Sequence, residues 1–143
     1  MTQPTYDDAN LILRLYEMRR EARLRQARAW FTAHFKPATW DDLTRLAPTG
    51  SDEHASYRMV ITYWDMAASF VTSGVLDQHL FFQSGREMLL VWERVKEVLP
   101  AIREKYEDPH LWMHLEKVGT DYAEWLARQS PGAYPALLKR IKG

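Results

Sequence analysis

The sequence contains no cysteine and only six glycines among its 143 residues. Without cysteine it has no disulfide, no thiolate nucleophile and no thiolate metal site. This composition is typical of a reducing compartment, so we expect a cytoplasmic protein. The chain also lacks a signal-peptide pattern at its start and any apolar run of about 18 residues, and we therefore expect no membrane span.

An excess of one charge sign is also absent, because 19 basic and 19 acidic side chains give a formal net charge of zero. Such a chain has no global field that attracts nucleic acid or an anionic membrane, and either partner would need a local cluster. Phosphate-binding loops, serine-hydrolase elbows and zinc-protease helices are missing as well. We therefore expect no cofactor, and the sequence favours a protein that is not an enzyme.

Residues 57–73 predict a helix that is buried around most of its circumference. A helix with apolar side chains on nearly all sides lies inside a bundle or a membrane, and a narrow polar edge here favours the bundle. No segment alternates with period two, and no long repeat occurs, so we expect a single all-α domain of about six or seven helices. The two apolar rows of the central helix are Tyr57, Val60, Ile61, Trp64, Ala67, Ala68 and Val71, and Met59, Tyr63, Met66 and Phe70.

Residues 8–35 contain no glycine or proline and predict one long N-terminal helix. Its length of roughly 42 Å exceeds the diameter of about 30 Å of a small domain, so we expect it to protrude. The body would then comprise residues 39–128, and residues 129–143 would form a tail helix. An exposed apolar seam needs a partner, and we expect a homodimer through this helix, or another protein bound to it. The expected contact surface consists of Leu11, Leu15, Met18, Ala22, Arg19 and Arg23.

The same helix is rich in arginine, which could follow a phosphate backbone, so nucleic-acid binding is an alternative function. Aromatic residues that could stack on bases are missing between Arg19 and Arg28. A solvated or protein-binding helix face is therefore the simpler interpretation.

Two further helix starts carry specific signals. Ser84 and Glu87 form the S-x-x-E pattern of a capping box before an apolar run. Asp108 and Pro109 are a cap and first-turn pair for a later helix.

Two histidines, His110 and His114, lie four residues apart at the start of that later helix. This spacing can place two imidazoles against one metal ion. A zinc site needs three or four protein ligands, however, and Lys117 follows on the same helical row. A solvated helix face is the simpler interpretation, and we expect no metal site.

Asp65 is the one acidic residue of the segment 57–73. In a buried cleft its carboxyl would have a raised pKa and could serve a small enzyme or a ligand-binding protein. The simpler interpretation pairs it with Arg58 on the polar edge, or with an arginine of the N-terminal helix, since buried charges usually have partners. A non-enzymatic helical interaction or regulatory module is therefore the first expectation, and the small enzyme or ligand-binding protein is the alternative.

The run YWDMAASFVTSGVLDQHLFF at residues 63–82, followed by Trp92, by Leu99 and Pro100, and by Ile102 and Arg103, resembles a bacterial family of domains of unknown function. The likeness covers roughly residues 10 to 120, and its motifs are mostly core and turn residues. Some members of that family carry an N-terminal membrane anchor before the helical domain. The resemblance implies an all-α fold and carries no catalytic residues over to this chain.

Overall fold

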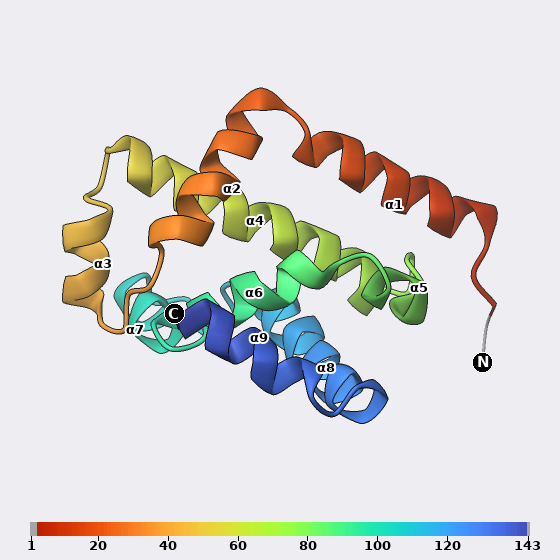
Figure 1. Ribbon diagram of the computed structural model, residues 1–143. Coiled ribbons are helices and arrows are strands. Elements are labelled where there is room, and N and C mark those ends of the chain that lie inside the picture. The colour runs from red at the N-terminus through yellow and green to blue at the C-terminus, as the bar shows by residue number, and fades with distance from the viewer. Residues whose placement is uncertain (1–2, 143) are drawn as a thin grey trace.

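The computed structural model describes residues 3–142, and within them it contains nine helices and no strand. The all-α, single-domain bundle expected from the sequence is confirmed (Figure 1). Among these residues, none of the helices combines the length and the apolar character that crossing a bilayer requires. The helices are α1 (Tyr6–Arg19), α2 (Ala22–His34), α3 (Trp40–Leu46), α4 (Asp52–Thr72), α5 (Gln78–Phe82), α6 (Arg86–Val95), α7 (Leu99–Lys105), α8 (Met113–Gln129) and α9 (Ala133–Lys142).

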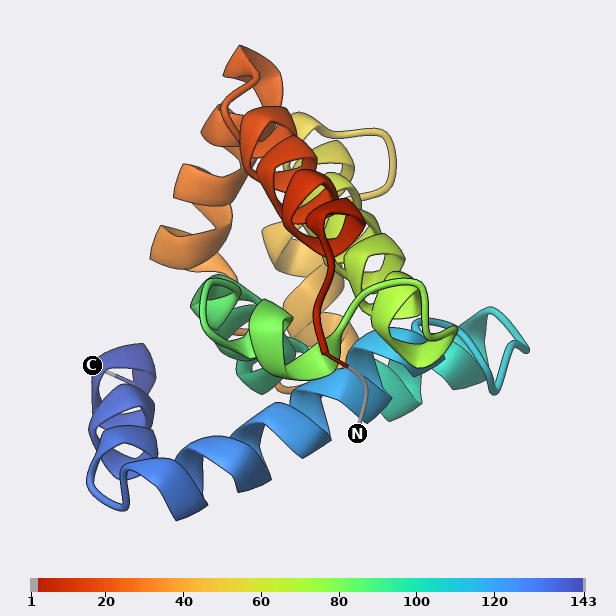
Figure 2. The same cartoon turned by 90° about the vertical axis from the view of Figure 1, so that its right-hand side faces the viewer.

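Helix α4 is the centre of the bundle, as the apolar rows predicted. The two most extensive helix–helix contacts of the bundle are those of α4 with α2 and of α4 with α8. In Figure 2 α1 lies in front of α4, α2 lies to one side of it, and α8 runs below it. Ser51 caps the start of α4 by accepting the N–H of His54, and Gly74 follows the end of the helix with a positive φ of 83°. Of the first apolar row only Val71, near the C-terminal end, is half-buried rather than buried.

The segment 8–35 is divided into two helices, which differs from the single protruding helix expected. The helix is interrupted at Glu21, because the carboxylate of this residue accepts the N–H groups of Arg23 and Leu24 and so caps the start of α2. The reason lies in the apolar pattern: Leu15 and Leu24 are nine residues apart, which places them on opposite sides of a straight helix at 3.6 residues per turn. The break lets α1 bury Leu15 while α2 turns back and buries Leu24 and Phe31 (Figure 1).

The starts of α6 and α8 also differ from the sequence prediction. Gly85, without a side-chain cap, precedes α6, and the carboxylate of Glu87 binds side chains of other helices instead of forming a capping box with Ser84. Helix α8 begins only after Trp112, which has a left-handed conformation with φ 57°. Asp108 lies in the preceding turn, where it accepts the N–H of His110. At α6 the carboxylate of Glu87 is engaged by tertiary partners, and at α8 the helix begins too late in the sequence for Asp108 to cap it.

Helices α6 and α8 approach each other closely at Gly119. A Cβ atom at this position would lie 2.5 Å from Cγ of Trp92, whose ring is buried between the two helices. Real Cβ contacts are essentially never this short, so the absence of a side chain at Gly119 is what allows the indole to pack here.

Replacing Gly119 by alanine should therefore destabilise the fold by about 1–3 kcal/mol, because the added methyl group overpacks the contact with Trp92. Gly132→Ala is the matched control, since nothing lies within 4 Å of a Cβ at that position. Chemical denaturation of both variants measures the free energy of unfolding. Equal stability of Gly119→Ala and the wild type would show that α6 and α8 can move apart without a loss of stability.

Candidate functional site

Asp65 lies on α4, half-buried, where its Oδ1 accepts the backbone N–H of Leu115 at 3.0 Å. Leu115 belongs to the first turn of α8, where backbone N–H groups have no partner within their own helix. Within residues 3–142 no hydrogen bond or ion pair joins Asp65 to Arg58, and Asp65 lines none of the cavities described below. The carboxylate therefore acts as a cap supplied by a neighbouring helix.

The two histidines do not share a helix face, because α8 starts three residues after His110. His110 is exposed in the turn, whereas Nδ1 of His114 lies 2.7 Å from Oγ1 of Thr72 on α4. In the described part of the chain, no three residues among His, Asp and Glu are grouped so that they could hold a metal ion. A spacing of four residues would place the two imidazole rings side by side only if His110 and His114 lay in the same helix.

The arginines of the N-terminal segment are divided between the interior and the surface. Arg19 donates to the hydroxyl of Tyr63 at 3.1 Å, and Arg23 donates to Oγ of Ser56 at 3.2 Å. Arg28 makes two bonds of 2.8 Å to the carboxylate of Glu87. Three of the arginines thus bind α4 and α6, and the stretch does not present one continuous row of free guanidinium groups to a phosphate backbone.

Arg28, Glu87 and Trp64 form a polar network at the junction of four helices. The indole N–H of Trp64, whose side chain is fully buried, donates to Glu87 Oε2 at 3.2 Å. Arg28 also donates to the carbonyl of Arg19 at the end of α1, 3.0 Å away. Its hydrogen bond to Glu87 raises the pKa of Arg28, against the opposing effect of burial. The carboxylate of Glu87 therefore joins α2, α4 and α6, and Arg28 extends the network to α1.

Arg94 on α6 is buried and holds the ends of two helices. Its Nη1 donates to the carbonyls of Thr32 at 3.0 Å and Phe35 at 3.2 Å, at the C-terminal end of α2, and its Nη2 donates to the carbonyl of Ile141 on α9. Burial lowers the pKa of the Arg94 guanidinium. Carbonyls at a helix C-terminus lack intrahelical partners and carry partial negative charge, so they can accommodate this cation without a carboxylate.

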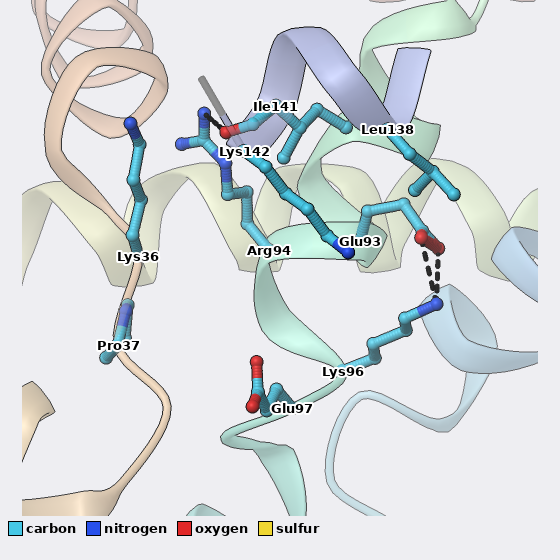
Figure 3. Close-up of a pocket in the computed structure, with 9 residues that line it drawn as sticks. All are labelled: Lys36, Pro37, Glu93, Arg94, Lys96, Glu97, Leu138, Ile141 and Lys142. Carbon is cyan, nitrogen blue, oxygen red and sulfur yellow. Dashed lines mark hydrogen bonds and ion pairs between the residues drawn. The ribbon is translucent and has the colours of Figure 1, made fainter. Parts of the chain in front are cut away.

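A cavity of about 410 Å³ lies beside Arg94 and is a candidate for a small-molecule site. Three of its six charged side chains are engaged by the fold. Glu93 binds Lys96 at 2.8 Å and accepts the hydroxyl of Tyr134, and Arg94 donates to helix-end carbonyls. Figure 3 shows Lys36 and Lys96 on opposite sides of the cavity rather than converging on one point. The lining residues are Lys36, Pro37, Glu93, Arg94, Lys96, Glu97, Leu138, Ile141 and Lys142.

The outer face of α1 is the largest group of exposed apolar side chains on one helix. Tyr6 is 90% exposed, Leu13 59% and Tyr16 51%, and with Ala9 they follow one another at intervals of three, four and three residues. We call Tyr6, Ala9, Leu13 and Tyr16 the outer stripe. The sequence analysis did not predict the outer stripe. Its residues have the same three-and-four spacing as the expected contact surface, but they lie on the opposite side of the helix.

The contact surface expected from the sequence lies mostly elsewhere on the N-terminal segment. Leu15 is buried against the bundle and Leu11 is half-buried, so the expected seam faces inward. Met18 and Ala22 are exposed but do not continue the outer stripe, while Arg19 and Arg23 bind α4. The exposed apolar face of α1 is therefore not the one that the sequence predicted.

Glu87→Gln should destabilise the protein by about 1–3 kcal/mol, because it removes the charge that two guanidinium donors and a buried indole N–H share. The lower half of this range allows for solvent screening, since the Glu87 side chain is 29% exposed. Glu97→Gln, at an exposed position with no such partners, is the matched control. Urea denaturation measures the free energy of unfolding of both variants. A loss of stability in Glu97→Gln but not in Glu87→Gln would contradict the role assigned to Glu87.

A protein-family model described as a domain of unknown function, DUF4760, matches residues 4–122. Comparison with curated proteins and with solved structures found no significant match. The matched range begins just before α1 and ends within α8, so it includes both the outer stripe and the Arg28–Glu87 pair. This agrees with the resemblance to an uncharacterised domain family. Because the match covers most of its length, the chain belongs to the DUF4760 family of domains of unknown function.

Proposed function

We propose that the protein is a non-enzymatic helical interaction module that binds protein through the outer stripe of α1. The observation that carries this proposal is the exposure of Tyr6, Leu13 and Tyr16 on one face of one short helix. Contiguous exposed apolar surface marks binding sites, and tyrosine is enriched at protein interfaces because it offers a large contact area with a polar tip.

The attachment of α1 to the body supports the proposal, because a rigid surface loses less conformational freedom on binding. Asp8, 8% exposed, accepts the N–H of Asp77 at 2.9 Å and that of Thr5 at 2.7 Å. Leu15 is buried beneath the helix, and its carbonyl accepts the hydroxyl of Tyr63. The outer stripe thus stands on a helix fixed at both its N-terminal and its middle turns.

The enzyme alternative has no comparable support. Asp65 is engaged as a cap of α8, and the guanidinium of Arg94 is engaged by helix-end carbonyls. A catalytic site needs an acid, a base or a nucleophile aimed at a shared point in a cavity. The charged groups around the cavity beside Arg94 are instead bound to one another or spread around its rim (Figure 3).

Photo-crosslinking in the source cells tests the interaction surface directly. A photoreactive phenylalanine analogue at Leu13 should give a covalent protein adduct, because this position lies in the middle of the outer stripe. The same analogue at Ala127, exposed on α8, is the matched control and should give none. Absence of any protein adduct from position 13, or equal adducts from both positions, would overturn the proposal.

The attachment of α1 should weaken in acid, because the pKa of Asp8 is lowered from its ordinary value of 3.8, first by the N–H of Thr5 and then by that of Asp77. A carboxyl with a depressed folded-state pKa contributes stability above its unfolded pKa and loses it as the pH falls through the folded value. Asp8→Asn should therefore melt at a lower temperature than the wild type at pH 7.

The difference between Asp8→Asn and the wild type should shrink once the pH is well below 3.8, where the wild-type carboxyl is itself neutral. Thermal melts from pH 7 to acid measure this. Asp7→Asn, an exposed neighbour on the same turn, serves as the control. A difference that stayed constant over the whole pH range would contradict the role assigned to Asp8.

A further inference from the structure

We propose that the cavity beside Arg94 binds a small organic carboxylate whose hydrocarbon part lies against α9. This binding goes beyond the proposed protein interaction and does not depend on the outer stripe. Three observations carry it: a buried cation without an ionic partner, an excess of positive charge in the lining, and an apolar wall beside the cations. Helix α9, which forms most of that wall, follows the residues 4–122 that the family model matches.

Arg94 is a buried cation that no carboxylate neutralises. It is 8% exposed, and among residues 3–142 it forms no ion pair. Its Nη1 and Nη2 donate to carbonyls, while its Nε is buried and has no hydrogen-bond partner within the same residues. Carbonyls at helix ends carry only a partial negative charge, so they compensate the guanidinium incompletely. An anion in the adjoining cavity would supply the missing charge.

Two lysines add to the positive charge of the cavity. Lys36 follows the end of α2, and Lys142 is the last residue of α9. Both line the cavity and are exposed, and in the described part of the chain neither forms an ion pair. Four basic and two acidic side chains line the cavity, which is an excess of two positive charges in a chain of zero formal net charge. This excess favours an anion as the ligand.

The two acidic side chains of the lining lie apart from the free cations. Glu93 is bound to Lys96 at 2.8 Å, and Glu97 is exposed. Figure 3 shows the charged ends of Lys36 and Arg94 in one part of the view and both carboxylates in other parts. An anion that enters the cavity would therefore be attracted most strongly towards Lys36 and Arg94.

The apolar part of the lining determines the class of anion. Pro37 and Ile141 are buried and Leu138 is half-buried, and the last two belong to α9. A hydrocarbon body can bury its surface against these residues while its charged end faces the cations. The cavity is also bounded by the C-terminal ends of α2 and α9, whose carbonyls repel negative charge. This repulsion disfavours a doubly charged phosphate more than a singly charged carboxylate.

The first test is titration of the full chain with 4-phenylbutyrate, followed by two-dimensional ¹⁵N NMR. A ligand of about twelve non-hydrogen atoms binds weakly, so we expect a Kd on the order of 1 mM. The amide signals of Lys36, Leu138 and Ile141 should shift, because these residues line the cavity. The neutral 4-phenylbutanamide lacks the charge, and inorganic phosphate lacks the hydrocarbon. Each should bind at least about tenfold more weakly than 4-phenylbutyrate.

The second test changes the charge of the lining. Lys36→Glu combined with Lys142→Glu should raise the Kd for 4-phenylbutyrate about tenfold or more, because it replaces attraction by repulsion. Lys139→Glu with Arg140→Glu is the matched control: it makes the same change of charge at exposed positions of α9 outside the lining. Glu97→Gln should lower the Kd about twofold, since it removes a negative charge from the lining. All these residues are exposed, so thermal melts should match the wild type.

The third test asks whether the ligand holds α9 in place. The cavity is formed by residues that follow α2, by α6 with the turn after it, and by α9, so the ligand binds only while α9 is packed on the body. At a 4-phenylbutyrate concentration about ten times the Kd, hydrogen exchange of the α9 amides should slow about tenfold. The variant Lys36→Glu with Lys142→Glu should show no slowing at the same concentration.

The absence of NMR shifts up to about 20 mM 4-phenylbutyrate would overturn the proposal. So would equal binding of the amide or of phosphate, or a Kd that Lys36→Glu with Lys142→Glu leaves unchanged. Unaltered hydrogen exchange of α9 under saturation would also contradict it. None of these outcomes bears on the outer stripe, which the cross-linking experiment at Leu13 tests separately.

Discussion

Helix α4 can be buried only if neighbouring helices cover it from several directions, because its apolar side chains occupy nearly its whole circumference. Helices α2 and α8 supply the two largest contacts, and α6 lies between them on the same core. This requirement explains why the N-terminal segment breaks at Glu21. A single straight helix could not bury Leu15 and Leu24 together, so the chain forms two helices and places both residues against the body.

The charged groups next to the core serve mainly to join helices to one another. Glu87 binds Arg28 of α2 and Trp64 of α4, while Arg94 binds carbonyls at the ends of α2 and α9. In each case one side chain satisfies several groups that would otherwise be desolvated without a partner. Much of the arginine content, which first suggests a binding surface for anions, is therefore explained by the packing of the bundle.

Helix α1 differs from the other helices in having two apolar faces, one buried and one exposed. Its inner face carries Leu15 and is fixed to the body through Asp8 and Tyr63. The outer stripe is exposed, although the guanidinium groups of Arg19 and Arg20 lie over the ring of Tyr16. Interior contacts make the helix rigid, and rigidity makes the outer stripe suitable for recognition. The same helix thus connects the stability of the bundle with the interaction proposed for it.

The sequence alone determined the features that depend on local spacing. The apolar rows of α4 predicted a buried helix with Trp64 in the core, and the absence of alternating patterns excluded strands. These signals are local because residues three or four apart share a helix face wherever the helix lies. The all-α fold and the family likeness could therefore be predicted from the residues.

Only the tertiary structure decided which side chains meet across the bundle. Asp65 caps α8 from 50 residues away, and Glu87 binds Arg28 across 59 residues rather than capping its own helix with Ser84. No local window contains both members of such a pair. The orientation of α1 depends on the same long-range contacts: its sequence carries apolar residues on two faces, and the packing against α4 and α5 selected Leu15 for burial and left Leu13 exposed.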